Sequence, residues 1–292
     1  MTAALTVRAR AAAPTKNVWH ALTDAAELRV WLAEHAEVEL PHRYEFWGRY
    51  IPEGDAPHQR PVHVGDNTLR FTWLLDGEET TTEIQLTEES PDSTIVSLSQ
   101  SHWSFEDAMS GTTIRGVLQT YWSLAIANLV DHVEGRPITP RTDFTSSTFR
   151  EELLIDAPAD AIYDSLTDSA KASEWFGYPV GIEPVVGGRW AMGGFDNNPN
   201  PAKVLDLTPG RAMTVDWGPV GVVTWELEES AGKTKLSFVQ SGFDTGNPPY
   251  GAWAGWLSGL AELRRYHELA DWRPIWLPEP TDNASVDASA TA

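Results

Sequence analysis

Apolar and polar positions alternate along much of the chain, in the pattern typical of half-buried β-strands. Met213, Val215 and Trp217 lie on one face of their segment, and Thr214 and Asp216 lie on the other. The segments at 223–229 and 233–241 show the same period of two, and glycine-containing turns at 187–188, 209–210 and 231–232 separate such segments. The pattern predicts an antiparallel sheet with one buried face.

Two longer segments carry an apolar stripe at helical spacing instead. The first runs from about Thr112 to Glu134, and Gly135 follows it as a C-terminal stop. The second carries Trp253, Trp256 and the leucines at 257, 260 and 263. Both are predicted to be long helices, each of which closes one half of the chain.

The halves repeat each other. Residues 13–32 match residues 157–176 without a gap, at a spacing of 144 positions. The spacing falls to 140 between 98–103 and 238–243, and to 134 between Trp122 and Trp256. A spacing that changes only across loops is typical of a duplicated domain that has lost loop residues.

Each repeat has the same order of predicted elements: one strand, two short helices, a meander of about six strands, and one long helix. The first strands lie at 5–11 and 149–157, and Asp24 and Asp168 are placed to cap the second short helices. The fold class is therefore α+β. We expect a first domain at 1–136, a linker at 137–148, a second domain at 149–276, and a disordered tail at 277–292.

Composition excludes several classes of protein. The 292 residues include no cysteine and carry a net charge of -21, which argues against binding to nucleic acid or to an anionic membrane surface. No apolar run approaches the roughly 20 residues that a membrane helix needs. Arginines interrupt the apolar N-terminus, so it is a poor signal peptide, and we expect a soluble, cytoplasmic protein.

The sequence contains no established catalytic motif. It lacks the nucleophile elbow G-x-S-x-G, the phosphate-binding loop and the dinucleotide fingerprint. His58 and His63 lie in a proline-rich stretch, 51–66, which we expect to be an exposed loop and a weak metal site. We therefore expect neither a metal nor a cofactor.

The better candidates are polar and aromatic side chains on the predicted inward faces. Gln100 and Gln240 occupy matched positions on the last strands, where a buried amide needs a partner. That partner is either a ligand or a group in the core, and each aromatic side chain could likewise serve packing alone. His102 is a weak acid–base candidate. The predicted ligand contacts are Phe71, Trp73, Gln100, His102, Trp122, Trp190, Trp217, Trp225, Phe238, Gln240, Trp253 and Trp256.

The second half carries an ordered set of motifs: APADAIYDSLTD, EWF, GGRWAMGG, VLDLTPGRAMTVDW and GWLSGLAEL. In this order they resemble the START/Bet v1-like superfamily, also called SRPBCC, and within it the subgroup named after the activator of a heat-shock-protein ATPase. The resemblance implies two tandem helix-grip domains in contact. Each has a curved antiparallel sheet around a long C-terminal helix, and an apolar cavity lies between that sheet and that helix. The first half has PHRY at 41–44 where the second has GGRW, so its cavity is expected to be reshaped or lost.

Three functions fit these observations. The first is non-covalent binding of a hydrophobic, aromatic or polyketide-like molecule in an internal cavity, for sequestration, transport or self-protection in secondary metabolism. The second is a polyketide cyclase or aromatase, for which His102 would supply the acid–base group. The second half has Gly242 at the position that matches His102, so it lacks this group. The third is a co-chaperone-like module that contacts another protein. The sequence ranks the binder first and leaves enzymatic activity open.

Overall fold

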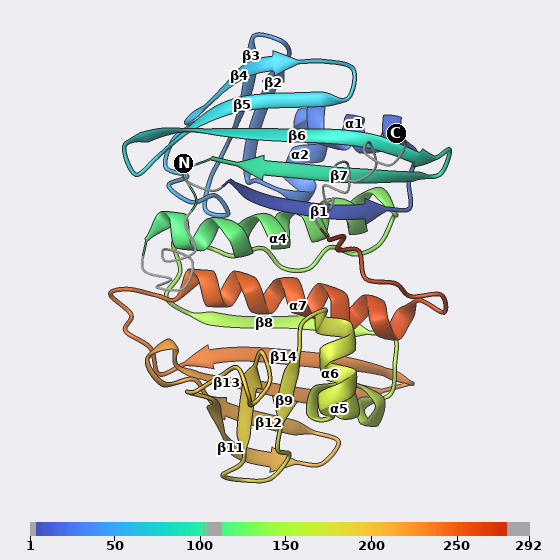
Figure 1. The fold of residues 1–292 in the computed structure, drawn as a ribbon, viewed down its shortest axis with the longest axis vertical. Helices are drawn as coiled ribbons and strands as arrows, with labels where there is room; N and C mark the ends of the chain where they lie inside the picture. The colour runs from blue at the N-terminus through green and yellow to red at the C-terminus, as the bar shows by residue number, and fades with distance from the viewer. Residues whose placement is uncertain (1–3, 102, 104–112, 279–292) are drawn as a thin grey trace, which may run out of the picture.

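The structure is a computed structural model that describes residues 4–101, 103 and 113–278. Figure 1 shows two similar halves, each with its sheet on the outside of the molecule. Two long helices, α4 (Ile114–Val133) and α7 (Tyr250–Glu268), lie side by side between the sheets. Within the described ranges, no helix has both the length and the apolar character needed to cross a lipid bilayer.

The first half builds a five-stranded antiparallel sheet in the order β1-β7-β6-β5-β4, with a separate β2-β3 hairpin. Its elements before α4 are β1 (Leu5–Ala11), α1 (Thr15–Thr23), α2 (Ala25–Trp31), β2 (His35–Glu39), β3 (Arg43–Trp47), β4 (Gln59–Val64), β5 (Thr68–Leu75), β6 (Glu78–Ser90) and β7 (Ser93–Gln100).

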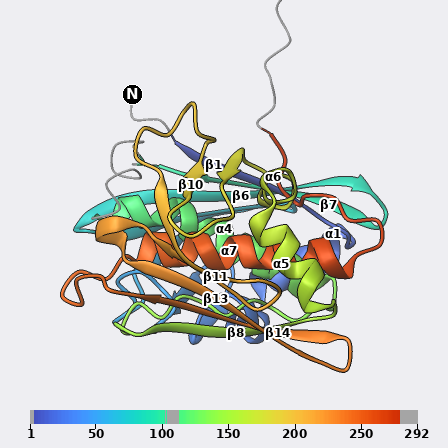
Figure 2. The same ribbon diagram turned by 90° about the horizontal axis from the view of Figure 1, so that it is seen from below.

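The second half builds one seven-stranded antiparallel sheet in the order β8-β14-β13-β12-β11-β10-β9, which α7 crosses (Figure 2). Its elements before α7 are β8 (Phe149–Ile155), α5 (Ala159–Thr167), α6 (Ser169–Phe176), β9 (Val180–Ile182), β10 (Arg189–Met192), β11 (Ala202–Thr208), β12 (Ala212–Asp216), the 3-10 helix η1 (Gly218–Val220), β13 (Val222–Ser230) and β14 (Lys233–Ser241). The predicted α+β class with two tandem helix-grip domains is confirmed.

The repeat extends to individual hydrogen bonds. Asp24 accepts two backbone N–H bonds at the start of α2, and Asp168 does the same at the start of α6. The indole of Trp31 donates at 2.9 Å to the carbonyl ten residues earlier, and Trp175 repeats this bond at the same length. The sequence repeat therefore encodes the same local geometry in both halves.

The stretch at 51–66 differs from the exposed loop that the sequence predicted. Its second part forms β4, an edge strand that pairs with β5 and shifts register between Pro61 and His63. Proline is tolerated at a sheet edge and at a bulge because no neighbouring strand needs its missing N–H. The proline content therefore marked an edge strand rather than a loop.

The two long helices pack along each other with their N-terminal ends together. The position of a Cβ on Gly251 would lie 3.7 Å from the carbonyl oxygen of Gly116, so small residues allow a close approach near the helix starts. Leu124 of α4 belongs to the second-half core, and Ala261 of α7 belongs to the first-half core. Each helix is therefore buried on two sides, which explains why α4 is apolar almost all round.

A buried charge cluster joins the C-terminal ends of the two helices. The carboxylate of Asp131, which is fully buried, accepts from Arg264 at 2.8 Å and from Arg265 at 2.7 Å. Arg265 also donates to Glu134 at 2.8 Å. Because all these bonds run from α7 to α4 or to Glu134, which caps α4, the cluster sets how the halves are placed relative to each other.

A segment that follows α7 returns to the first half and lies against β1. Arg10 N–H donates to the carbonyl of Ile275 at 2.8 Å, and Leu277 N–H donates to the carbonyl of Arg8 at 2.9 Å. Glu262 of α7 accepts from the backbone N–H of Ile275 at 3.0 Å and holds this segment in place. Residues 279–292 of the predicted tail lie outside the described residues.

Replacing Asp131 by alanine is expected to lower the free energy of unfolding by about 3–5 kcal/mol, because two buried guanidinium groups lose their shared carboxylate. Replacing Asp164 by alanine is expected to lower the same free energy by about 0–1 kcal/mol, because its ion pair with Lys171 is exposed. Urea unfolding of both variants measures the difference. Equal losses would contradict a structural role for the buried cluster.

Burial raises the pKa of Glu262 to about 7, against an ordinary value of 4.5. A carboxyl whose pKa is higher in the folded state stabilises the fold below about pH 4.5, and this contribution is lost as the pH rises through about 7. Relative to Glu262→Gln, the wild type is therefore expected to lose on the order of 3 kcal/mol of unfolding free energy over that interval. Urea unfolding at several pH values measures it, and parallel pH profiles for the two proteins would refute the prediction.

Candidate functional site

Six of the predicted contacts come together in the second half and define what we call the tryptophan cluster: Trp190, Trp217, Trp225, Phe238, Trp253 and Trp256. Trp256 of α7 is central, with its ring 5.1 Å from that of Trp217 and 5.4 Å from that of Trp225. Most of these contacts are edge-to-face, whereas Phe238 and Trp253 stack at 5.0 Å. Strand alternation and the stripe of α7 thus converge on one space.

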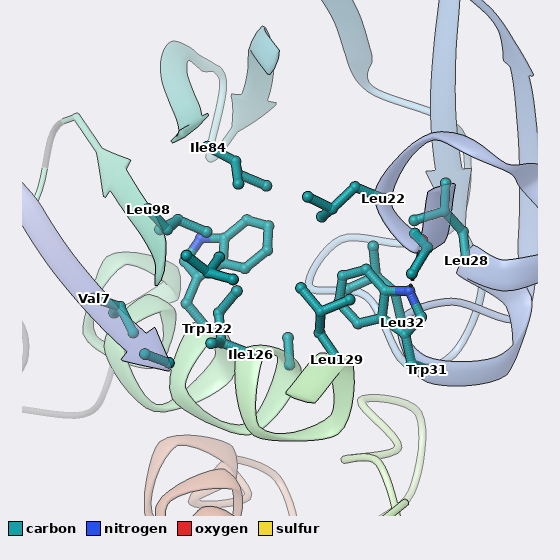
Figure 3. Close-up of a cluster of buried hydrophobic side chains, with 14 of the residues drawn as sticks. Val7, Leu22, Leu28, Trp31, Leu32, Ile84, Leu98, Trp122, Ile126 and Leu129 are labelled. Atoms are coloured by element: carbon teal, nitrogen blue, oxygen red, sulfur yellow. Dashed lines mark hydrogen bonds between the residues drawn. The ribbon is translucent and has the colours of Figure 1, made fainter. Parts of the chain in front are cut away.

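Three predicted contacts come together in the first half. Phe71, Trp73 and Trp122 are each at most 1% exposed, and the rings of Trp73 and Trp122 meet edge-to-face at 5.9 Å. In Figure 3 Trp122 rises from α4 toward Leu98 and Ile84. Three further aromatic residues complete this group and were not among the predicted contacts: Tyr44, Phe46 and Tyr121. The alternation over 43–47 and the helical spacing of Tyr121 from Leu118 and Ala125 are the signals that could have revealed them.

The two matched glutamines differ in their bonding. The side-chain oxygen of Gln100 accepts from the Thr82 hydroxyl at 2.6 Å and from the Trp122 indole at 3.3 Å. Gln240 donates at 2.7 Å to the carbonyl of Val220, while its own side-chain oxygen has no hydrogen-bond partner among the described residues. Gln100 is therefore bonded within the core, whereas Gln240 keeps a free acceptor.

The tryptophan cluster also contains two free donors. Within the described part of the chain, the indole N–H groups of Trp190 and Trp217 are buried and lack acceptors. The first half has comparable orphans in the indole of Trp73 and the hydroxyl of Tyr121, whose pKa is raised by burial. The halves differ in access, because Trp217 is partly exposed whereas Trp73 is fully enclosed.

His102, the weak acid–base candidate, lies outside the described residues. The ligand roles of all twelve predicted contacts stay predictions. Among described side chains, no group of three or more histidines and carboxylates is arranged to hold a metal ion.

Four of the cavities among the described residues are lined by none of the predicted ligand contacts. The largest of the four, about 570 Å³, lies between β8, α7 and the segment that follows α4. Sequence reasoning missed it because it forms between segments that are distant in the chain.

The sequence profile of a protein family described as "Activator of Hsp90 ATPase homolog 1-like protein" matches residues 12–134 and 156–268. No curated protein matches the chain. Among solved structures, a conserved protein of unknown function, EF2215 from Enterococcus faecalis, is 28% identical over 44% of this chain and 75% of its own length, with a TM-score of 0.37.

Two further solved structures match nearly the whole chain. The di-domain ARO/CYC protein BexL from the BE-7585A biosynthetic pathway is 15% identical, covers 94% of this chain and 100% of its own, and has a TM-score of 0.36. DynU16, from the dynemicin biosynthetic locus, is 17% identical, covers 90% of this chain and 98% of its own, and has a TM-score of 0.37.

The different bonding of the two glutamines predicts different costs of removal. Gln100→Leu is expected to lower the free energy of unfolding by about 2 kcal/mol, because it leaves the Thr82 hydroxyl and the Trp122 indole unpaired. Gln240→Leu is expected to lower the free energy of unfolding by about 1 kcal/mol or less. It leaves the carbonyl of Val220 without its donor, but it also removes the side-chain oxygen that has no partner. Denaturant unfolding measures both, and a larger loss for Gln240→Leu would contradict the assignment.

Proposed function

The chain belongs to the family of activator of Hsp90 ATPase homolog 1-like proteins in both of its halves, and we propose that its second half binds a flat, hydrophobic small molecule at the tryptophan cluster. The observation that carries the proposal is the set of buried polar groups in and beside this cluster that lack partners among the described residues. These are the indole N–H groups of Trp190 and Trp217 and the side-chain oxygen of Gln240.

A buried polar group without a hydrogen-bond partner lowers the stability of the fold by about 1–3 kcal/mol. Three such groups in and beside one cluster therefore favour a bound molecule that pairs with them. A guest with ring carbonyls would accept from the indoles, and a guest hydroxyl would donate to Gln240. The equivalent amide in the first half, Gln100, is already bonded to Thr82 and Trp122. The unpaired groups of the first half, on Trp73 and Tyr121, belong to buried side chains, whereas Trp217 is partly exposed, and so the proposal concerns the second half.

The entrance to the tryptophan cluster for such a guest is at Trp217. This residue follows β12, is partly exposed, and is the N-cap of η1, which begins at Gly218 and is followed by Gly221, both at positive φ. Gln240 holds η1 through its bond to the carbonyl of Val220. None of the four cavities reaches the cluster, so a guest enters when the Trp217 indole moves out, and Gly218 and Gly221 allow that movement.

The chemistry of the cluster favours binding over catalysis. Its six aromatic residues offer ring faces, and each aromatic pair contributes about 0.5–1.5 kcal/mol beyond the area it buries. Indole and amide groups neither gain nor lose a proton near neutral pH, so the cluster itself supplies no general acid or base. A fused-ring aromatic metabolite of the polyketide type, held for sequestration, transport or self-protection, fits this site.

Titration with 1,8-dihydroxyanthraquinone, a flat probe with carbonyls and hydroxyls, is expected to quench tryptophan fluorescence saturably. Gln240→Leu should weaken binding by about tenfold, because it removes an acceptor from the site. Gln100→Leu is the matched control and should bind as the wild type does. Absence of saturable binding by calorimetry, or equal effects of the two substitutions, would refute the proposal.

A further inference from the structure

The chain contains two related segments, each of which follows one of the long helices. We call Arg136–Pro140, with the sequence RPITP, the linker strap, and Arg273–Leu277, with the sequence RPIWL followed by Pro278, the C-terminal strap. Both are tied to the helix that precedes them. Asn128 of α4 bonds both backbone groups of Thr139, at 2.9 and 3.0 Å, and Glu262 of α7 accepts from Ile275 N–H.

The C-terminal strap adds a strand to the edge of the first-half sheet. It bonds to Arg8 and Arg10 of β1, and Trp276 forms an antiparallel bridge with Ala9. Ile275 is 2% exposed and belongs to the first-half core. The edge of β1 is therefore covered by an extended segment with the pattern Ile-Trp-Leu.

Strand β8 is the counterpart of β1 at the same register. Arg8 lies opposite Ser97 of β7, and its equivalent Glu152 lies opposite Ser237 of β14. The surroundings repeat as well, since Ala12 N–H donates to Glu134 at 2.9 Å and Asp156 N–H donates to Glu268 at 3.0 Å. By this equivalence, the N–H of Leu154 and the carbonyl of Glu152 face the outer edge of β8.

The linker strap lies near this edge without pairing to it. Its prolines, Pro137 and Pro140, have no N–H to donate, Asn128 already bonds both backbone groups of Thr139, and Ile138 packs against the first-half core. The cavity of about 570 Å³ remains between the linker strap, α7 and the β8 residues at 152–154 and 156. Leu154 lines it and is 61% exposed.

We propose that this cleft binds an extended peptide segment of a partner protein, with an apolar-aromatic-apolar pattern, as an added antiparallel strand on β8. The C-terminal strap on β1 is the precedent within the same chain, and strand addition of this kind is a recurrent mode of peptide recognition. Backbone bonds to Glu152 and Leu154 would set the register, and Leu154 and Ile138 would contact the apolar side chains. The charges around the cleft are already paired, as in Lys233 with Asp156 and Arg136 with Glu268, so the peptide needs no net charge.

The probe is a fluorescein-labelled peptide, DWRPIWLP, which corresponds to residues 271–278, titrated into the full chain. Fluorescence anisotropy is expected to show saturable binding, and hydrogen exchange should slow at 152–154 while it stays unchanged at 8–10. The same peptide with an N-methyl group at the leucine, which removes the donor that bonds β1 in the strap, should bind about tenfold more weakly. Slowed exchange at 8–10 alone, or equal binding of the methylated peptide, would overturn the proposal.

Leu154→Pro removes the edge donor at a sheet edge, where proline is tolerated, and is expected to abolish binding. Leu154→Ala keeps the N–H and is the matched control, with a smaller loss. Circular dichroism tests whether both variants fold. If Leu154→Pro does not fold, the binding of the methylated peptide and the hydrogen-exchange pattern of the wild type test the proposal instead. Self-association of the protein through this cleft without peptide, seen by sedimentation, would also overturn the proposal, because a second copy would then be the occupant.

Discussion

The packing of α4 against α7 is the constraint on which the rest of the structure depends. Each of these two helices closes its own sheet on one side and meets the other helix on the second side, so both are buried on two sides. Small residues at the helix starts permit close approach, and at the other end the fully buried Asp131 holds Arg264 and Arg265. A buried carboxylate shared by two guanidiniums tolerates little displacement, so it fixes the relative position of the two halves.

That constraint also separates the two interiors in function. The first-half aromatic group is sealed, with its glutamine bonded to the Trp122 indole in the core. The tryptophan cluster of the second half has the same origin but leaves Gln240, Trp190 and Trp217 with unsatisfied polar atoms among the described residues, beside a partly exposed ring. Two copies of one fold thus differ in the bonding of their matched glutamines and in access to their aromatic groups.

The straps show a second difference of the same kind. Segments that begin with the same residues, Arg-Pro-Ile, follow both helices, yet only the C-terminal strap pairs with the neighbouring sheet edge among the described residues. In the linker strap, Pro137 and Pro140 have no N–H to donate and Asn128 bonds both backbone groups of Thr139, whereas a strand needs backbone N–H groups at the right register. The edge of β8 therefore stays open, whereas the edge of β1 is covered. Because the two edges are equivalent in the repeat, the C-terminal strap on β1 indicates the kind of segment that could pair with β8.

The sequence by itself determined the duplication, the order of elements, the capping residues Asp24 and Asp168, and the inward faces that carry the aromatic residues. These features depend on local periodicity and spacing, which a chain carries in its residue order. Only the tertiary structure decided that proline-rich 59–64 pairs as an edge strand, that Gln100 is satisfied while Gln240 is not, and that a cleft opens beside β8. Each of these depends on which distant backbone or side-chain groups come within hydrogen-bonding distance, and that is settled by packing rather than by pattern.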